Sequence, residues 1–203
     1  MNHTFKYEVP TWNQIFEMLV NQASKIQKDN YRPGLLVAVS RGGLVPARIL
    51  SDLLEFPELA IIKIEFYFGI DQTKIQPTIT QDLTIPVANR NVLLIDDIVD
   101  TGESINLAKK HIFEKGAREI KVATLYFKCK SKTMPDYFEA KTNGWVVFPW
   151  DVKETIRKIV EKKVSKYEAS KEVAKLIKAG LPKNLAEKLL KEIFQETNHA
   201  SIH

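Results

Sequence analysis

Residues 91–105, NVLLIDDIVDTGESI, constrain the fold of this chain more than any other stretch. An apolar run leads directly into two adjacent carboxylates, Asp96 and Asp97, and a third, Asp100, comes just before a Thr-Gly turn and a helical pattern. Carboxylates at the end of a buried strand are costly unless something binds them. In an open α/β sheet, ligands bind beyond the carboxyl ends of the strands. The stretch therefore predicts a buried strand, a ligand site and a helix, in that order.

The residue types at this strand end indicate what the ligand is. A helix N-terminus has unpaired backbone N–H groups and about half a positive charge, so it attracts anions. A phosphate can bind to residues 101–104, where Gly102 allows a close backbone approach and Thr101 and Ser104 add hydroxyls. Asp96 and Asp97 can hold a polyhydroxylated or metal-bound group. A helix cap explains Thr101 alone, but the whole stretch favours a sugar phosphate.

A second anion-binding turn is predicted at residues 39–47, VSRGGLVPA. Here an apolar run ends at Ser-Arg-Gly-Gly and a helical pattern follows. Arg41 can make a bidentate contact to a phosphate, and the backbone N–H groups of Gly42 and Gly43 can line the turn. Taken alone this is also an ordinary strand-to-helix turn. Beside the first stretch, it predicts a second phosphate pocket at the same sheet edge.

The periodicity of the chain predicts an α/β fold with a doubly wound, mostly parallel sheet. A polar segment at 69–89 is expected to be a flap, a β-hairpin arm, or both. Three short helices are expected over 151–196, which divides the chain into a core, 1–150, and a helical extension, 151–203. The other expected elements are strands at 35–39, 59–68, 91–95, 120–129 and 144–150, and helices at 10–29, 44–56 and 103–116.

Composition narrows the class of protein. The apolar runs are too short to span a membrane, no signal peptide is evident at the N-terminus, and the single cysteine, Cys129, excludes an internal disulfide. We therefore expect a cytoplasmic protein. The formal charge of +5 lies largely after position 150, where solvated helix faces account for it. Without basic residues interleaved with exposed aromatics, no nucleic-acid partner is expected.

Three segments resemble one family. VLLIDDIVDTGESI looks like the phosphoribosyl pyrophosphate signature of the type I phosphoribosyltransferases. AVSRGGLVPA resembles the pyrophosphate loop of their 6-oxopurine, or xanthine-guanine, branch, and GWVVFPWD resembles the base-binding segment of that branch. The matches run in the right order over about residues 10–151. The resemblance implies the type I phosphoribosyltransferase fold, phosphoribosyl pyrophosphate and a purine base as substrates, Mg²⁺ as cofactor and a homodimer.

The resemblance also implies a role for each matching residue. Asp96 and Asp97 would hold the ribose hydroxyls and the Mg²⁺ ion, with Asp151 near the ion as well. Asp100 would manage the proton of the purine imidazole ring, and with Asp97 and Arg41 it would form the catalytic set. The 5′-phosphate would bind at Thr101, Gly102, Glu103 and Ser104, the pyrophosphate at Ser40, Arg41 and Gly42, and the base at Lys128, Trp145 and Val146, under a flap that includes Tyr67.

The choice of base rests on two features that point in different directions. The lysine at 128 favours an oxopurine, although Lys130 in KCKS competes for that role. The helical extension is similar to that of crenarchaeal adenine phosphoribosyltransferases, and we take adenine as the expectation and a 6-oxopurine as the alternative. A regulator of the same fold that binds nucleotides without turning them over is a third reading.

Overall fold

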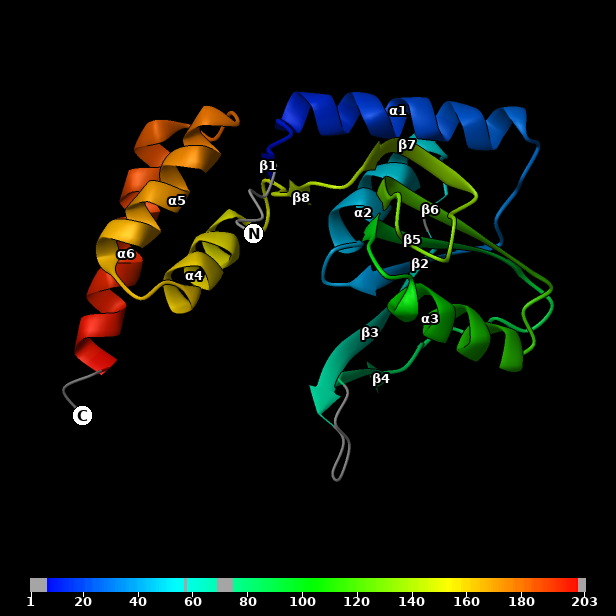
Figure 1. Ribbon diagram of the computed structural model, residues 1–203. Helices are drawn as coiled ribbons and strands as arrows, with labels where there is room; N and C mark the ends of the chain where they lie inside the picture. Colours follow the sequence, from blue (N-terminus) through cyan, green and yellow to red (C-terminus); the bar gives the residue numbers. More distant parts are fainter. Residues whose placement is uncertain (1–6, 57, 69–74, 201–203) are drawn as a thin grey trace. The chain divides into compact units, whose positions relative to one another are not determined.

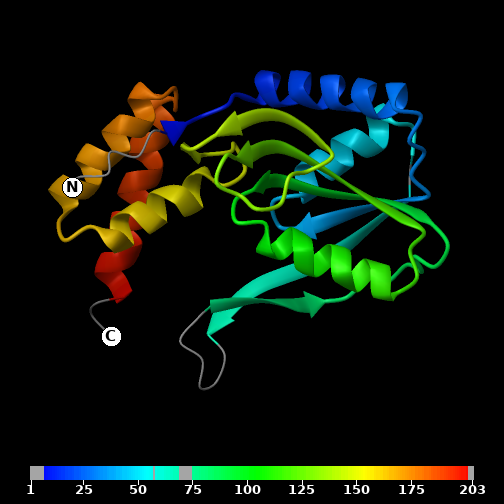
Figure 2. The same ribbon diagram turned by 45° about the vertical axis from the view of Figure 1, so that its right-hand side comes forward.

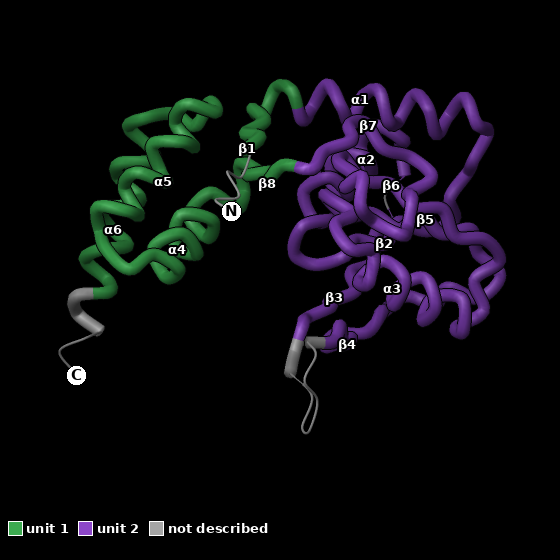
Figure 3. The backbone as a smooth tube through the Cα atoms, in the orientation of Figure 1, with its two compact units in different colours: residues 1–14, 144–203 green, residues 15–143 purple. Residues whose placement is uncertain are grey.

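The computed structural model describes residues 7–56, 58–68 and 75–200, and the chain divides into two compact units (Figure 3). Residues 15–143 form what we call the core unit. The helical unit combines residues 144–203 with the first fourteen residues of the chain. The expected boundary at 150/151 follows the change in sequence character. The compact units instead divide at 143/144, because a short N-terminal strand pairs with a strand that precedes the C-terminal helices.

The core unit contains a six-stranded sheet in its described residues, with the order β4-β3-β2-β5-β6-β7. Only β3 and β4 pair antiparallel, and all other neighbours are parallel (Figure 1). The predicted mostly parallel sheet is thus confirmed. The strands are β2 (Leu35–Ser40), β3 (Leu59–Phe68), β4 (Ile75–Gln81), β5 (Asn91–Val99), β6 (Glu119–Lys128) and β7 (Tyr137–Thr142).

Helices cover both faces of this sheet, so the fold is doubly wound as expected. Figure 2 shows α1 (Trp12–Lys28) and α2 (Leu44–Leu53) over one face and α3 (Glu103–Glu114) over the other. From β2 the chain continues to its neighbour β3, toward one edge of the sheet, and from β5 it continues to its neighbour β6, toward the opposite edge. The direction in which strands are added therefore reverses between β2 and β5. Because β2 is buried along almost its whole length, its residues read as a continuous apolar run rather than an alternating one.

Two segments differ from the expectation. The predicted fifth strand at 144–150 is not part of the main sheet: only β8 (Trp145–Val146) forms there, paired with β1 (Tyr7–Glu8) in a separate two-stranded sheet. β8 ends at Val146, three residues before Pro149, which could not donate a backbone hydrogen bond to a continuing strand. The sixth strand of the main sheet is β7, whose sequence, YFEAKT, mixes polar and apolar residues as an edge strand can.

The polar segment at 69–89 includes β4, which pairs with β3 over the register Lys63↔Gln81 to Phe68↔Ile75. The segment therefore supplies one strand of a hairpin whose other strand, β3, precedes it, whereas residues 82–89, which the alternating pattern also placed in the arm, form no strand. Residues 69–74, which also belong to the predicted flap, lie outside the described residues. The role of this arm as a flap stays a prediction.

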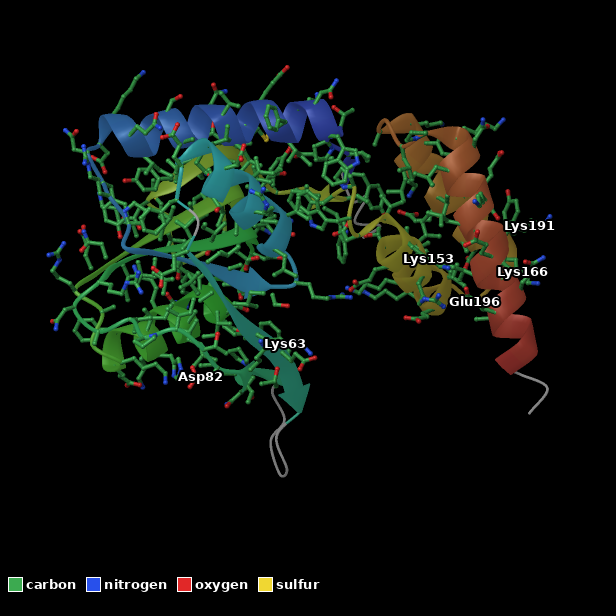
Figure 4. All side chains as sticks on the ribbon, turned by 180° about the vertical axis from the view of Figure 1, so that it is seen from behind. Lys63, Asp82, Lys153, Lys166, Lys191 and Glu196 are labelled. Atoms are coloured by element: carbon green, nitrogen blue, oxygen red, sulfur yellow. The ribbon has the colours of Figure 1, made fainter. Side chains whose placement is uncertain are left out.

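The helical unit contains the three predicted helices, α4 (Val152–Lys162), α5 (Lys166–Lys178) and α6 (Lys183–Ala200). They enclose a core of their own, to which Val147, Ile156, Leu176 and Ile193 contribute fully buried side chains. The ammonium group of Lys153 lies 3.2 Å from a carboxylate oxygen of Glu196 and joins α4 to α6 (Figure 4). In the described part of the chain, no helix combines the length and the apolar character that crossing a bilayer requires.

Replacing Ile193 by alanine tests whether this second core stabilises the helical unit. The fully buried side chain would leave a cavity, and we expect the free energy of unfolding to fall by about 2–5 kcal/mol. Leu185 lies on the same helix with 41% of its surface exposed, so Leu185→Ala should cost no more than about 1 kcal/mol. Urea denaturation of both variants measures the difference, and equal losses would contradict the assignment of the core.

Candidate active site

The two predicted anion-binding turns lie side by side at the carboxyl edge of the sheet. They follow β2 and β5, which are neighbours, and Ala38 pairs with Ile95 at the last position of their register. A methyl group added to Gly42 would lie only 2.5 Å from Oδ1 of Asp97. The α-carbon of Gly42 therefore rests directly against the Asp97 carboxylate, and the two turns form one site.

The turn after β2 needs its glycines for space. A methyl group on Gly43 would come within 2.2 Å of the Ile95 carbonyl oxygen, so α2 starts in direct contact with the β5 backbone. Arg41 is exposed, and the peptide bond between Ser40 and Arg41 is cis. Ser40, Arg41 and Gly42 thus stand together at the strand end, where the pyrophosphate contact is predicted.

The turn after β5 presents the N-terminus of α3. Gly102 has a φ of +91°, in the left-handed region that favours glycine, and its carbonyl oxygen accepts the first helical hydrogen bond, from the Asn106 N–H at 2.9 Å. The Thr101 hydroxyl accepts a weak hydrogen bond from the Glu103 N–H at 3.3 Å. The Gly102 cap has no side chain to bond the first-turn N–H groups, which leaves this helix end suited to an anion.

The paired carboxylates carry an electrostatic cost. The backbone N–H of Asp97 donates to Oδ1 of Asp96 at 2.9 Å. Removal from water, and then repulsion by the Asp97 carboxylate, raises the pKa of Asp96 well above its usual range, against the smaller opposing effect of that hydrogen bond. Two carboxylates held together in this way are relieved when a cation or a hydrogen-bond donor binds them.

A contact that sequence reasoning missed joins the turn after β5 to the segment after β6. A methyl group on Gly102 would lie 2.5 Å from Oγ1 of Thr133 and 3.1 Å from Oγ of Ser131. The Asn106 side-chain amide donates to the same Thr133 hydroxyl at 2.8 Å. The only signal in the sequence is a pair of hydroxyl residues in a polar loop, which is too common to single out.

The residues predicted to contact the base and to form the flap lie at different places in the core unit. Lys128 is the half-buried last residue of β6, whereas Lys130 is exposed in the turn that follows. Both stay candidates for the base contact. Tyr67 lies in β3 and its backbone pairs with Gln76, but its side chain is outside the described part of the structure.

Trp145, Val146 and Asp151 belong to the helical unit, so their predicted contacts to the base and the metal stay predictions. Val146 is buried in β8, and Asp151 occupies the cap position of α4. Trp145 lines a cavity of about 120 Å³ together with Tyr7, and the ammonium group of Lys162 lies 5.9 Å from the centre of its indole ring. Trp145 is half-buried and also packs against the core of the helical unit.

Comparison with known proteins shows which family the chain is similar to. Residues 11–157 match the phosphoribosyl transferase domain. A xanthine-guanine phosphoribosyltransferase of Gluconobacter oxydans is 28% identical over 151 residues, covering 73% of this chain and 86% of the relative. The enzyme described by the same name from Idiomarina loihiensis is 31% identical over 58% of this chain and 70% of its own length.

A solved structure extends the comparison to three dimensions. The purine phosphoribosyltransferase of Pyrococcus horikoshii is similar with a TM-score of 0.66 and 33% identity, over 71% of this chain and 93% of that protein. The matched domain, residues 11–157, includes the two turns at the carboxyl edge of the sheet. The chain therefore belongs to the type I phosphoribosyltransferase family, within its purine branch.

Proposed function

We propose that this protein transfers the phosphoribosyl group of phosphoribosyl pyrophosphate to a 6-oxopurine, releasing pyrophosphate and forming the purine nucleotide. The observation that carries the proposal is the contact between Gly42 and the Asp97 carboxylate. It brings a predicted pyrophosphate turn against a predicted ribose-phosphate turn, as a substrate with phosphate groups at both ends of one ribose requires. The names of the similar enzymes from Gluconobacter and Idiomarina support xanthine or guanine as the base.

Adenine, the expectation from the sequence, is less well supported. It rests on the C-terminal helices alone, whereas the similar proteins reported above are described as xanthine-guanine or purine enzymes. An oxopurine also suits a cationic residue at the end of β6, since a lysine donates hydrogen bonds and the purine 6-oxygen accepts them. Adenine carries an amino donor at that position, and a site built for one group penalises the other.

The reaction forms a bond from a purine ring nitrogen to the anomeric carbon while the bond from that carbon to the pyrophosphate oxygen breaks. In the proposed roles, the first turn of α3 binds the 5′-phosphate, Asp96 and Asp97 bind the ribose hydroxyls, and Arg41 binds the leaving pyrophosphate. Asp100 lies in the exposed turn between β5 and α3, where it would accept the proton that the purine ring loses. Catalysis by positioning and charge stabilisation needs no protein nucleophile.

Magnesium is the proposed cofactor, and the residues fit it. The Asp96–Asp97 pair is acidic and mutually repulsive, and Mg²⁺ commonly binds one or two carboxylates while substrate phosphates supply its other ligands. Among the residues that the structure describes, no group of three or more histidines, cysteines and carboxylates could hold a metal by itself. When bound, the ion would neutralise charge on the pyrophosphate, while the carboxylates orient the ribose.

The substrate proposal is tested by incubating the protein with phosphoribosyl pyrophosphate, Mg²⁺ and one of adenine, hypoxanthine, guanine, xanthine or uracil. We expect nucleotide from at least one oxopurine, with a kcat/KM at least about 100-fold above that for adenine, because an unmatched buried polar group is strongly penalised. Preference for adenine would restore the alternative based on the helical extension. Nucleotide binding without turnover of any base would support a regulator.

The base-reading lysine is tested by Lys128→Met, with Lys130→Met as its matched control. If Lys128 donates to the 6-oxygen, removing its ammonium group should raise the KM for the oxopurine by roughly 10–100-fold, the usual effect of losing a hydrogen bond from a charged donor. The control should stay within about threefold of the wild type. The opposite ranking would assign the contact to Lys130.

Asp96→Asn, in buffer containing EDTA, tests whether the paired carboxylates lower the free energy of unfolding. Because the folded-state pKa of Asp96 is raised, the wild type loses stability as pH rises from about 4, the ordinary value, through that raised pKa. The variant avoids this loss, so it should be more stable than the wild type at pH 8, with a gain that shrinks to near zero at pH 4. The same variant should lose most of its transferase activity.

Urea denaturation at a series of pH values measures this difference. Asp52→Asn, at an exposed position on α2, is the matched control for the loss of an aspartate carboxylate elsewhere in the core unit. An Asp96→Asn protein that is less stable than the wild type at pH 8 would contradict the assignment of an electrostatic cost to the pair.

A further inference from the structure

The segment after β6 makes a contact with the 5′-phosphate turn that the proposed reaction does not yet use. We call residues 129–133, between β6 and β7, the 129–133 loop. We propose that this loop positions the phosphate-binding turn, with Thr133 as the positioning residue and Asn106 as its partner. The inference rests on the proposed function in one respect, namely that the turn at residues 101–104 binds the 5′-phosphate.

The first step of the argument is steric. Gly102 carries no side chain, and the space where its Cβ would lie is occupied by Thr133, with Oγ1 at 2.5 Å and Cβ at 2.6 Å from that point. Thr133 therefore packs directly on the α-carbon of Gly102. Since Gly102 has a φ of +91° and little intrinsic preference among backbone conformations, a neighbour that fills this space helps to fix the conformation of the turn.

The second step is a hydrogen-bonded link to α3. Asn106 belongs to the first turn of the helix: its backbone N–H donates to the Gly102 carbonyl at 2.9 Å, and its side-chain amide donates to the Thr133 hydroxyl at 2.8 Å. One residue thus connects the helix start, the glycine and the 129–133 loop. The N–H groups proposed to bind the phosphate lie on this connected piece of backbone.

The third step concerns the stiffness of the loop itself. The Ser131 hydroxyl accepts from the Thr133 N–H at 3.2 Å and donates to the Thr133 carbonyl oxygen at 3.1 Å, while the Ser131 N–H donates to the Lys128 carbonyl oxygen at 2.9 Å. The loop is therefore a hydrogen-bonded turn that begins at Lys128. One short stretch of backbone therefore runs from the proposed base-reading lysine to Thr133, whose side chain contacts the proposed phosphate turn.

If Thr133 positions the phosphate-binding turn, variants that remove its hydrogen bond should weaken phosphate binding, whereas the loss of an ordinary surface hydrogen bond should not. Thr133→Val keeps the shape that fills the space at Gly102 but cannot accept the hydrogen bond from Asn106, and Asn106→Leu removes the donor. Each variant should weaken the binding of ribose 5-phosphate by about 3–10-fold, which corresponds to the net value of one hydrogen bond. Because both substitutions remove the same interaction, the double variant should bind ribose 5-phosphate with about the same affinity as either single variant.

The experiment is a calorimetric titration of the full chain with ribose 5-phosphate in phosphate-free buffer with Mg²⁺. Thr133→Ser retains the hydroxyl and should bind within about twofold of the wild type. Met134→Ala changes the next residue, which is 64% exposed, and serves as the control for a change in this region. In steady-state assays, Thr133→Val should raise the KM for phosphoribosyl pyrophosphate while kcat and the KM for the base stay within about twofold, the pattern of lost ground-state binding.

The outcomes separate this inference from the proposed function. Unchanged affinity of Thr133→Val for ribose 5-phosphate overturns the positioning role, and so does an equal loss in Met134→Ala. A wild-type protein that does not bind ribose 5-phosphate overturns it too, since the turn would then hold no phosphate. A wild-type protein that binds ribose 5-phosphate but makes no nucleotide from any base refutes the transferase proposal and leaves the titration of the variants as the test of the loop.

Discussion

The close approach of Gly42 to the Asp97 carboxylate is the constraint on which the rest of this structure depends. Two parallel strands, β2 and β5, run side by side, and the turns beyond them come so near that no side chain fits at Gly42. The strand order of the sheet reverses between these two strands, and a crevice at such a reversal is where open α/β sheets bind ligands. The two predicted anion-binding turns therefore lie together because of the topology of the sheet.

The sequence predicts this part of the fold well because its signals are local. Continuous apolar runs mark buried parallel strands, and the residues that follow them are the ones that the topology gathers at one edge. Signals weaken where the pairing is non-local or short. β7 is an edge strand of mixed polarity, and β1 pairs with β8 across most of the length of the chain over two residues only. No pattern within either segment identifies its partner.

The candidate site was predictable to the same extent and for the same reason. Each turn could be identified from its own residues, but the contact between Gly42 and Asp97 required the register of two strands, and the contact between Gly102 and Thr133 required a loop conformation. Composition cannot supply either. Hydroxyl residues such as Ser131 and Thr133 occur in most polar loops, so their role emerges only when the glycine beside them is seen to have its side-chain space filled.

The site combines two carboxylates held close together with glycine turns that pack tightly against neighbouring side chains. Asp96 and Asp97 repel each other and are partly removed from water, which lowers stability but leaves a strong preference for a cation or a row of hydroxyls. Beside them, the Asp97 carboxylate fills the side-chain space at Gly42, and Thr133 fills it at Gly102. Binding energy is then spent on the substrate rather than on ordering the turns, which is the advantage of a preorganised site. A transferase that works by positioning and charge compensation, with no nucleophile of its own, needs these two properties together.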